Sequence, residues 1–408
     1  MVFLYSLAIT VYFLGILIAS LINRKARLWI RGRRNIFDEI KEQVKQSDNL
    51  FWFHASSLGE FEQGRPLIET IKKKYNSVKI LLTFFSPSGY EIRKNYQNAD
   101  YIFYLPIDTK RNALKFLKLI GPAKAFFIKY EFWYHYLDQL NKLNIPVYLI
   151  SAKFRQEQIF FRFYGKWFRN MLLKFAHIFV QDKSSERLLK IIGLNDVTIS
   201  GDTRFDRVAE LAKQSKKIEI VEKFKQDSTI IIAGSTWEKD EALIIEFINN
   251  TSHKLKYIIA PHEIYKSNIQ RISNSIKKPS VLYSASNIDN VSKFEVLIID
   301  NIGMLASLYK YADIAYIGGG FGIGIHNILE AATFGLPVVF GTKYKKFKEA
   351  VDLVSLGGAF SICGYTSLKK QFEDLLEMRK RNYAGGISEK YVLENQGATS
   401  IILERIKP

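Results

Sequence analysis

Glycines and polar side chains gather in the stretch 318–330. Three consecutive glycines begin at Gly318, directly after the apolar run 312–317. Because glycine has no Cβ, backbone N–H groups there can come close to a ligand. The pattern predicts a strand, a glycine turn and a helix that opens with His326 and Asn327, which is a place to hold a phosphate and a ribose; a glycine turn without a ligand is the alternative. The residues that we expect to take part are Gly319, Gly320, His326, Asn327 and Glu330.

A carboxylate follows the predicted strand 51–54, after a turn of small residues. The turn contains Ser56, Ser57 and Gly59, and Glu60 stands where this loop leads into a helix. A partly buried carboxylate in such a place can act as general base on a sugar hydroxyl. It can equally complement the positive N-terminus of the helix, and the sequence favours neither interpretation.

Two further loops in the same half of the chain carry polar side chains. Ser86 and Pro87 are typical of a helix N-cap and a first helical position, and the hydroxyls of Ser86 and Ser88 can also meet a ligand. Glu131 follows the strand 125–128, where it can bind acceptor hydroxyls or a cation, or be a plain first-turn glutamate.

In the second half of the chain, three predicted strands are also followed by turns whose residues can bind a ligand. Ser235 and Thr236 form a small-residue turn that can receive a phosphate on its backbone N–H groups. His262 can touch a phosphate or a base, although a lone histidine in a turn is more often structural. Gly303 and Met304 can line a nucleotide pocket with their amides.

From Leu50 onward, apolar strands alternate with helical stretches. This alternation is typical of a parallel α/β sheet, which would place the loops described above at one edge. The predicted strands are 51–54, 78–84, 101–105, 125–128, 147–150 and 178–180 in the first half, and 229–234, 257–260, 281–283, 296–299, 312–317 and 338–340 in the second. At 408 residues the chain exceeds what one hydrophobic core usually serves. We therefore predict two doubly wound, Rossmann-like domains that face a central cleft.

The apolar N-terminus and its basic flank indicate a membrane. Residues 1–22 contain no charged side chain and, as a helix with a rise of ~1.5 Å per residue, would cover about the thickness of the hydrocarbon core. A cleaved signal peptide would carry its positive charge before the apolar run, so we predict an uncleaved anchor whose flank stays cytoplasmic. The flanking basic residues are Arg24, Lys25, Arg27, Arg31, Arg33 and Arg34.

The charge and the single cysteine limit the classes of partner and site. A net charge of +19 calls for an anionic partner, and the anchor directs that expectation to a membrane surface, not to nucleic acid. Cys363 alone excludes an internal disulfide framework and a cysteine-rich zinc site. Because it follows an apolar run, we predict that it is a small core residue.

Six motifs, in their order along the chain, resemble those of one family. The chain is similar to the 3-deoxy-D-manno-octulosonic acid (Kdo) transferases of lipopolysaccharide assembly, which have the two-domain GT-B glycosyltransferase fold. The resemblance runs from the anchor to near the C-terminus. The motifs that carry it are 54–60, 86–89, 130–133, 201–206, 233–236 and 318–330.

The resemblance implies inverting transfer of Kdo from CMP-Kdo to a lipid A precursor at the cytoplasmic face of the inner membrane. Glu60 matches the catalytic base. Acceptor binding would fall to Ser56, Ser57, Gly59, Ser86, Ser88 and Glu131, and donor binding to Ser235, Thr236, His262, Gly303, Met304, Gly319, Gly320, His326, Asn327 and Glu330. Together with the patterns described above, the resemblance divides the chain into an anchor (1–22), a basic juxtamembrane segment (23–48), an acceptor-binding domain (49–206), a polar helical connection (207–225), a CMP-sugar-binding domain (226–385) and a C-terminal helix that we expect to cross back to the first domain (386–408).

The chain departs from the family pattern at three turns. Where the family commonly has Pro-Arg-His, the stretch 261–263 reads Pro-His-Glu and lacks the arginine, so that Lys266 or Arg271 would have to replace its phosphate contact. The Gly-Glu-Leu turn reads Gly-Met-Leu at 303–305, and Asn-Ala-Arg reads Ser-Ala-Lys at 151–153.

A CMP-sugar carries a single phosphate on its anomeric carbon, so helix N-termini and cations can stabilise the leaving group. No Asp-x-Asp motif stands at a predicted strand end, and we expect neither a metal nor a cofactor. A GT-B-type nucleotide-sugar epimerase and a non-enzymatic module for anionic lipid are the alternatives. The anchor argues against the first, and the ordered polar turns argue against the second.

The segment 153–169 interleaves aromatic residues with lysine and arginine, a composition typical of a membrane interface. We expect it to lie near the bilayer and guide the lipid acceptor. An ordinary helix that covers the sheet with snorkelling cations is the alternative.

Overall fold

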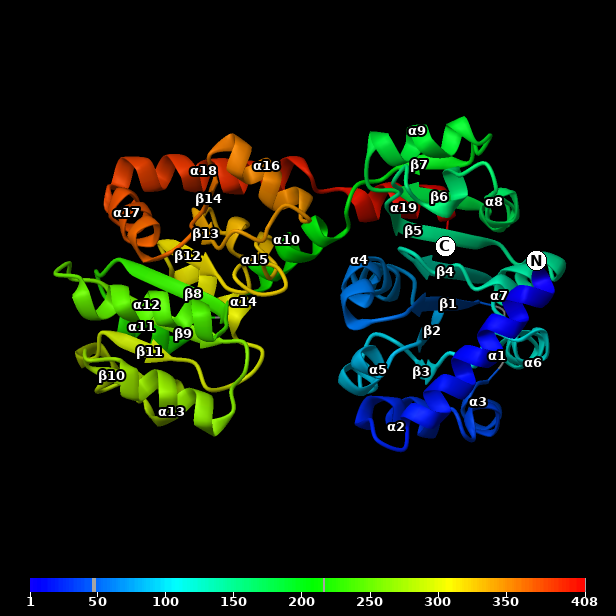
Figure 1. The fold of residues 1–408 in the computed structure, drawn as a ribbon, viewed down its shortest axis with the longest axis horizontal. Coiled ribbons are helices and arrows are strands. Elements are labelled where there is room, and N and C mark those ends of the chain that lie inside the picture. The colour runs from blue at the N-terminus through cyan, green and yellow to red at the C-terminus, as the bar shows by residue number, and fades with distance from the viewer. Residues whose placement is uncertain (46–48, 216, 408) are drawn as a thin grey trace. The chain divides into compact units, whose positions relative to one another are not determined.

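The computed structural model describes residues 1–45, 49–215 and 217–407. Its contacts divide the chain into two compact units, shown as ribbons in Figure 1. Unit 1 comprises Met1–Arg207 and Gln396–Pro408, and unit 2 comprises Val208–Asn395. Each unit contains one seven-stranded parallel sheet, as the alternating pattern predicts.

The sheet of unit 1 has the strand order β3-β2-β1-β4-β5-β6-β7. The chain builds outward from β1 to β2 and β3, then crosses to β4 on the other side of β1. The loops after β1 and β4 therefore diverge, and ligands of doubly wound sheets bind at such a switch point. The strands are β1 (Leu50–Ala55), β2 (Lys79–Phe84), β3 (Tyr101–Tyr104), β4 (Lys124–Ile128), β5 (Val147–Ala152), β6 (His177–Val180) and β7 (Val197–Ile199).

Both faces of this sheet are buried, which explains why its strands are apolar throughout. Along β1, Leu50 and Trp52 pack on one face against α6 (Lys110–Ile120) and α7 (Tyr134–Lys142). Phe51 and Phe53 point to the opposite face, toward α4 (Leu58–Lys74) and α19 (Ala398–Ile406). The other helices of unit 1 are α1 (Val2–Ala19), α2 (Arg24–Arg31), α3 (Ile36–Gln43), α5 (Pro87–Arg93), α8 (Lys166–Leu172) and α9 (Lys183–Ile191).

The C-terminal helix α19 belongs to unit 1, while α18 (Met378–Glu394) belongs to unit 2. The Asp206 carboxylate accepts hydrogen bonds from the backbone N–H groups of Gly397 (2.6 Å) and Thr399 (2.7 Å) at the start of α19. At the other end, Lys124 Nζ donates to the carbonyl of Ile406 (2.8 Å). These contacts hold the last helix on unit 1, at Asp206 near its start and at Lys124 of β4 near its end.

The sheet of unit 2 has the order β10-β11-β9-β8-β12-β13-β14, with its switch point between β8 and β12. Its strands are β8 (Ile230–Thr236), β9 (Lys256–Pro261), β10 (Ser280–Leu282), β11 (Val296–Ile298), β12 (Ile314–Ile317), β13 (Val338–Phe340) and β14 (Ala359–Ser361). Its helices, besides α18, are α10 (Arg204–Gln214), whose first turn belongs to unit 1, α11 (Glu219–Lys225), α12 (Glu238–Asn250), α13 (Lys266–Ser275), α14 (Leu305–Leu308), α15 (Leu329–Ala332), α16 (Lys348–Leu356) and α17 (Tyr365–Leu376).

Two local predictions are wrong. Cys363 is exposed, not a core residue, because the chain turns after β14 and its N–H group donates to Ser367 Oγ (3.0 Å) at the start of α17. The segment 207–225 is not one polar helix: α10 (Arg204–Gln214) ends before α11 begins. Val221 and Phe224 of α11 are fully buried, so this helix has a core face that its lysines conceal in the sequence.

Candidate active site

Glu60 lies in the first turn of α4, at the switch point of unit 1. Its Oε2 accepts hydrogen bonds from the Ser57 N–H group (3.0 Å) and the Ser57 hydroxyl (3.3 Å). Burial raises the pKa of Glu60, and the negative charge of Glu131 raises it further. The carboxylate therefore caps its helix, as one interpretation of the sequence predicts, and is a stronger proton acceptor than an exposed glutamate; its role as general base stays a prediction.

A buried hydrogen-bond network lies beside Glu60. Glu131 Oε2 is 3.0 Å from His54 Nε2 and accepts a hydrogen bond from Trp133 Nε1 (2.5 Å). The other ring nitrogen of His54, Nδ1, is 2.9 Å from Thr83 Oγ1. Burial alone would raise the pKa of Glu131, but hydrogen bonds from His54, Ser56 and Trp133 outweigh it and lower the pKa.

This network changes what Glu131 can do. The residue is only 5% exposed, and its Oε2 is already bonded to two protein groups. Glu131 is thus placed to position its neighbours, and acceptor binding by it stays a prediction. His54 was missed because its partner stands 77 positions away. The available signal was a histidine at the end of an otherwise apolar strand.

The loops that carry Ser56 and Ser86 lie side by side. The Ser86 N–H group donates to the carbonyl of Ser56 (2.8 Å), and Ser86 Oγ accepts from the Ser88 N–H group (3.1 Å). Ser86 is therefore the N-cap of α5 with Pro87 at the first helical position, as predicted. Ser88 and Gly59 are exposed, whereas Ser56, Ser57 and Ser86 are half-buried.

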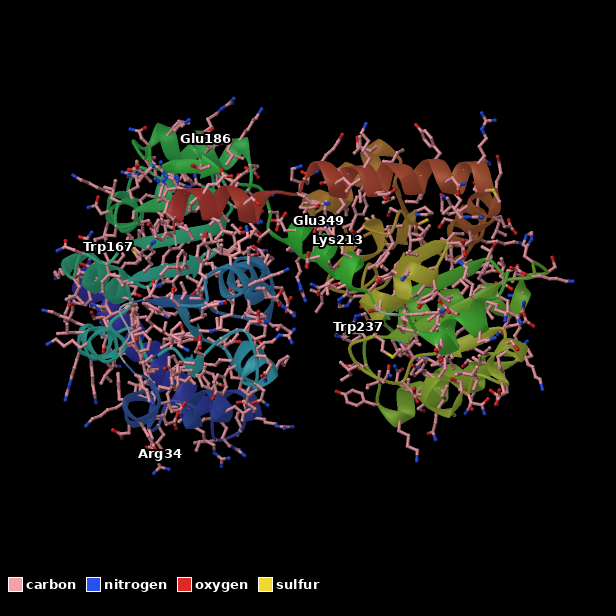
Figure 2. The ribbon with its side chains drawn as sticks, turned by 180° about the vertical axis from the view of Figure 1, so that it is seen from behind. Arg34, Trp167, Glu186, Lys213, Trp237 and Glu349 are labelled. Carbon is pink, nitrogen blue, oxygen red and sulfur yellow. The ribbon has the colours of Figure 1, made fainter. Side chains whose placement is uncertain are left out.

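Three aromatic rings from three strand ends stack in unit 2. Trp237, which follows β8, stacks on His262 with ring centroids 4.5 Å apart, and His262 stacks on His326 at the same distance. Trp237 Nε1 also donates to His326 Nε2 (3.0 Å). Burial and the charge of His262 lower the pKa of His326, which favours its neutral imidazole. Trp237, labelled in Figure 2, was not predicted as a site residue, although it directly follows the Ser235–Thr236 turn.

The three glycines allow backbones to pass closely at this end of the sheet. A Cβ on Gly318 would clash with the carbonyl of Ser235, and one on Gly320 would clash with the backbone of Gly341. The N–H group of Gly319 donates to the buried carboxylate of Asp240 (2.9 Å). In this structure that amide is engaged with the protein, so the glycines serve packing at least as much as ligand approach.

The helix after the glycines starts later than predicted. We expected it to open with His326 and Asn327, but α15 begins at Leu329. The reason is that Asn327 Oδ1 accepts from the Leu329 N–H group (3.2 Å), which ends the turn before the helix. Asn327 Nδ2 also donates to Glu330 Oε1 (3.0 Å), so these two predicted donor-site residues contact each other.

The remaining predicted donor-site residues border the same strand ends. Ser235 has a left-handed backbone (φ +52°) at an irregular end of β8, and Thr236 Oγ1 donates to the buried Glu241 carboxylate (3.1 Å). Glu241 is ion-paired with Arg271, whereas Lys266 is exposed. Gly303 is exposed, with φ +94°, and Met304 is the N-cap residue of α14. Within the described ranges, no group of three or more His, Cys, Asp or Glu side chains could hold a metal ion.

Comparison with known proteins finds relatives that are Kdo transferases. The family pattern of 3-deoxy-D-manno-octulosonic-acid transferases matches residues 31–207. The chain is 26% identical to the Kdo transferase of Haemophilus influenzae, over 88% of this chain and 86% of that protein, and 26% identical to that of Aquifex aeolicus, over 83% and 90%.

A solved structure supports the fold. The UDP-GlcNAc 2-epimerase of Neisseria meningitidis, bound to UDP-GlcNAc, matches with a TM-score of 0.60 over 88% of this chain and 98% of that one. At 17% identity this likeness shows a shared GT-B-like fold and nothing more. The chain is thus similar in sequence to 3-deoxy-D-manno-octulosonic acid transferases, through the pattern over residues 31–207 and through relatives that are 26% identical over most of their length.

Proposed function

We propose that this protein is an inverting glycosyltransferase that moves Kdo from CMP-Kdo to a lipid A precursor, with Glu60 as general base. The observation that carries the proposal is the half-buried Glu60 carboxylate with a raised pKa, at the switch point of unit 1, in a chain whose relatives are Kdo transferases. Unit 1 would bind the acceptor and unit 2 the donor.

At the acceptor oxygen, the reaction needs one group that accepts a proton. Glu60 accepts the proton of the acceptor hydroxyl while the oxygen of that hydroxyl bonds to the anomeric carbon of Kdo. The bond from the anomeric carbon to the phosphate oxygen of CMP breaks at the same time. The partial burial of Glu60 favours proton uptake because water solvates the charged form less well there. The hydrogen bonds from His54 and Trp133 favour the ionised form of the neighbouring Glu131 carboxylate and hold it in place.

On the donor side, we assign the flat ring surface of Trp237, His262 and His326 to the CMP moiety, because stacked rings offer an apolar face to a base or sugar. Asn327 and Glu330 would contact the phosphate and the ribose hydroxyls. We propose that no metal takes part, since one phosphate can be held by cations and N–H groups.

The proposal is tested by incubating the full chain in membranes with CMP-Kdo and lipid A precursor, with and without EDTA. Glu60→Gln should slow product formation by roughly 10²–10⁴-fold, the usual contribution of general base catalysis. Glu186→Gln is the matched control, because Glu186 is also a first-turn glutamate after a strand of the same sheet (Figure 2). Its activity should equal that of the wild type.

Three results would contradict the proposal. An undiminished rate for Glu60→Gln would remove Glu60 from the mechanism, and loss of activity in EDTA would contradict metal independence. Conversion of a nucleotide sugar without any acceptor would instead indicate an epimerase.

A further inference from the structure

The apolar helix α1 lies along unit 1 for most of its length (Figure 1). Its half-buried residues include Tyr5, Ser6, Ile9, Phe13 and Ile16, which share one face at helical spacing. This is the only helix of the described chain that is long and apolar enough to cross a membrane, with a mean hydropathy of 2.3. None of its residues is fully buried, and its other faces are open.

Polar contacts hold the N-terminal end of α1 against unit 1. Tyr5 donates its hydroxyl hydrogen bond to Asp108 Oδ2 (2.5 Å) and accepts one from the Tyr134 N–H group (3.2 Å). Ser6 Oγ lies 3.0 Å from His135 Nε2. Asp108 is 1% exposed and also accepts from the backbone at the start of α7, so Tyr5 completes the hydrogen bonding of a buried carboxylate.

Aromatic contacts hold α1 against unit 1 at Tyr5 and at Tyr12. The Tyr5 ring lies 5.7 Å from that of Trp167 in α8, which Figure 2 labels at the edge of unit 1. Two turns on, Tyr12 stacks on Phe85 (6.1 Å) and meets Trp29 of α2 (6.4 Å). The helix is thus fixed in one register by contacts seven residues apart.

These contacts exclude a bilayer-spanning α1. The 18 residues of α1 form a helix about 27 Å long at ~1.5 Å per residue, close to the thickness of the hydrocarbon core, and the basic flank follows after a turn. In a spanning helix Tyr5 would lie at the far side of the bilayer. There it could not reach Asp108, which stands in the same unit as the flank.

The geometry points to a monotopic arrangement, in which α1 stays docked on unit 1 and presents its open apolar side to one leaflet of the bilayer. The occupant of that side is lipid, because the helix carries no acidic residue and runs directly into basic residues that complement anionic headgroups. The opposite face of α1 packs against unit 1. In an isolated interfacial helix, that face would be polar and would contact water. The exposed side consists of Phe3, Leu4, Leu7, Val11, Leu14, Leu17 and Ile18.

This arrangement would bring the bilayer close to the switch point of unit 1. Phe85, which Tyr12 touches, also packs on Trp133 (4.5 Å), and Trp133 donates to Glu131. Two rings therefore separate the membrane-facing helix from the buried carboxylate. The inference concerns how unit 1 meets the membrane and holds whether or not the protein transfers Kdo.

Cross-linking in native membranes tests the docked position. The full chain with Cys363→Ser receives Ser6→Cys and His135→Cys and is treated with a short bismaleimide without detergent. The Tyr5 contacts remain in this variant. Most molecules should cross-link. The matched control pairs His135→Cys with Leu4→Cys, which faces the opposite side of α1, and should cross-link in only a minor fraction.

A second measurement does not depend on residue 135. Val2→Cys, in the same cysteine-free background, is exposed to a membrane-impermeant maleimide from the periplasmic side and, separately, after permeabilisation. We expect no labelling from the periplasm and labelling after permeabilisation. Periplasmic labelling of the Val2→Cys variant, or a 6–135 cross-link no stronger than the 4–135 cross-link, would overturn the monotopic arrangement.

Discussion

The two sheets share one plan, but the residues at their switch points differ in kind. In unit 1 the loops after β1 and β4 bring together two carboxylates and a histidine, held by hydrogen bonds. In unit 2 the loops after β8, β9 and β12 bring together three stacked rings. Two buried acids lie near them: Asp240 is bonded to backbone and tyrosine, and Glu241 is bonded to Thr236 and ion-paired with Arg271. The same scaffold thus carries a carboxylate network in unit 1, to which we assign proton transfer as a proposal, and a flat ring surface in unit 2, to which we assign donor binding as a proposal.

The unit 1 network should depend strongly on the pairing of His54 with Glu131. His54→Leu leaves a buried carboxylate without one of its donors, and we expect the free energy of unfolding to fall by about 1–3 kcal/mol. The double variant His54→Leu/Glu131→Leu should recover part of this loss because no charge remains buried. Chemical denaturation of the wild type, His54→Leu, Glu131→Leu and the double variant measures the coupling, and strictly additive losses would show that the pair is not coupled.

The stacked rings of unit 2 should matter for binding and little for folding. Trp237 is 40% exposed, so Trp237→Ala removes a ring face more than a core contact. We expect the KM for CMP-Kdo to rise about tenfold, the lower part of the range for a base stacked on an aromatic ring. Tyr265→Ala is the control, since Tyr265 is an exposed aromatic residue of the same unit. An unchanged KM for the Trp237 variant would remove the rings from the donor site.

The pH dependence should separate the two carboxylates of unit 1. As the proposed general base, Glu60 would act only when deprotonated, so kcat/KM should fall as the pH falls through its raised pKa. In Glu131→Gln the neighbouring negative charge is gone, and the acid limb should move to lower pH. A limb that does not move would mean that Glu131 has no influence on Glu60.

Glu60 and Glu131 should contribute to the pH dependence of the free energy of unfolding with opposite signs. Because folding raises the pKa of Glu60, its contribution to stability is present at low pH and lost as the pH rises through the folded value. Because folding lowers the pKa of Glu131, its contribution is present above the unfolded value and lost as the pH falls through the folded one.

Much of the fold could be read from the sequence because parallel strands buried on both faces are apolar runs, as in 51–54 and 230–234. Local capping was readable too, since Ser86 and Pro87 need only their immediate neighbours. The pair His54–Glu131 was not, because it depends on which strands become neighbours. The bond from Gly319 to Asp240 and the docking of Tyr5 on Asp108 likewise join residues far apart in the chain.

The central claim, that unit 1 carries the base and unit 2 binds the donor, is tested most directly by one comparison of steady-state kinetics. Glu60→Gln and Trp237→Ala are assayed with CMP-Kdo varied at saturating lipid A precursor. We predict that Glu60→Gln lowers kcat with little change in the KM for CMP-Kdo, whereas Trp237→Ala raises that KM with little change in kcat. The reverse pattern, or the same pattern in both variants, would contradict the division of labour between the two units.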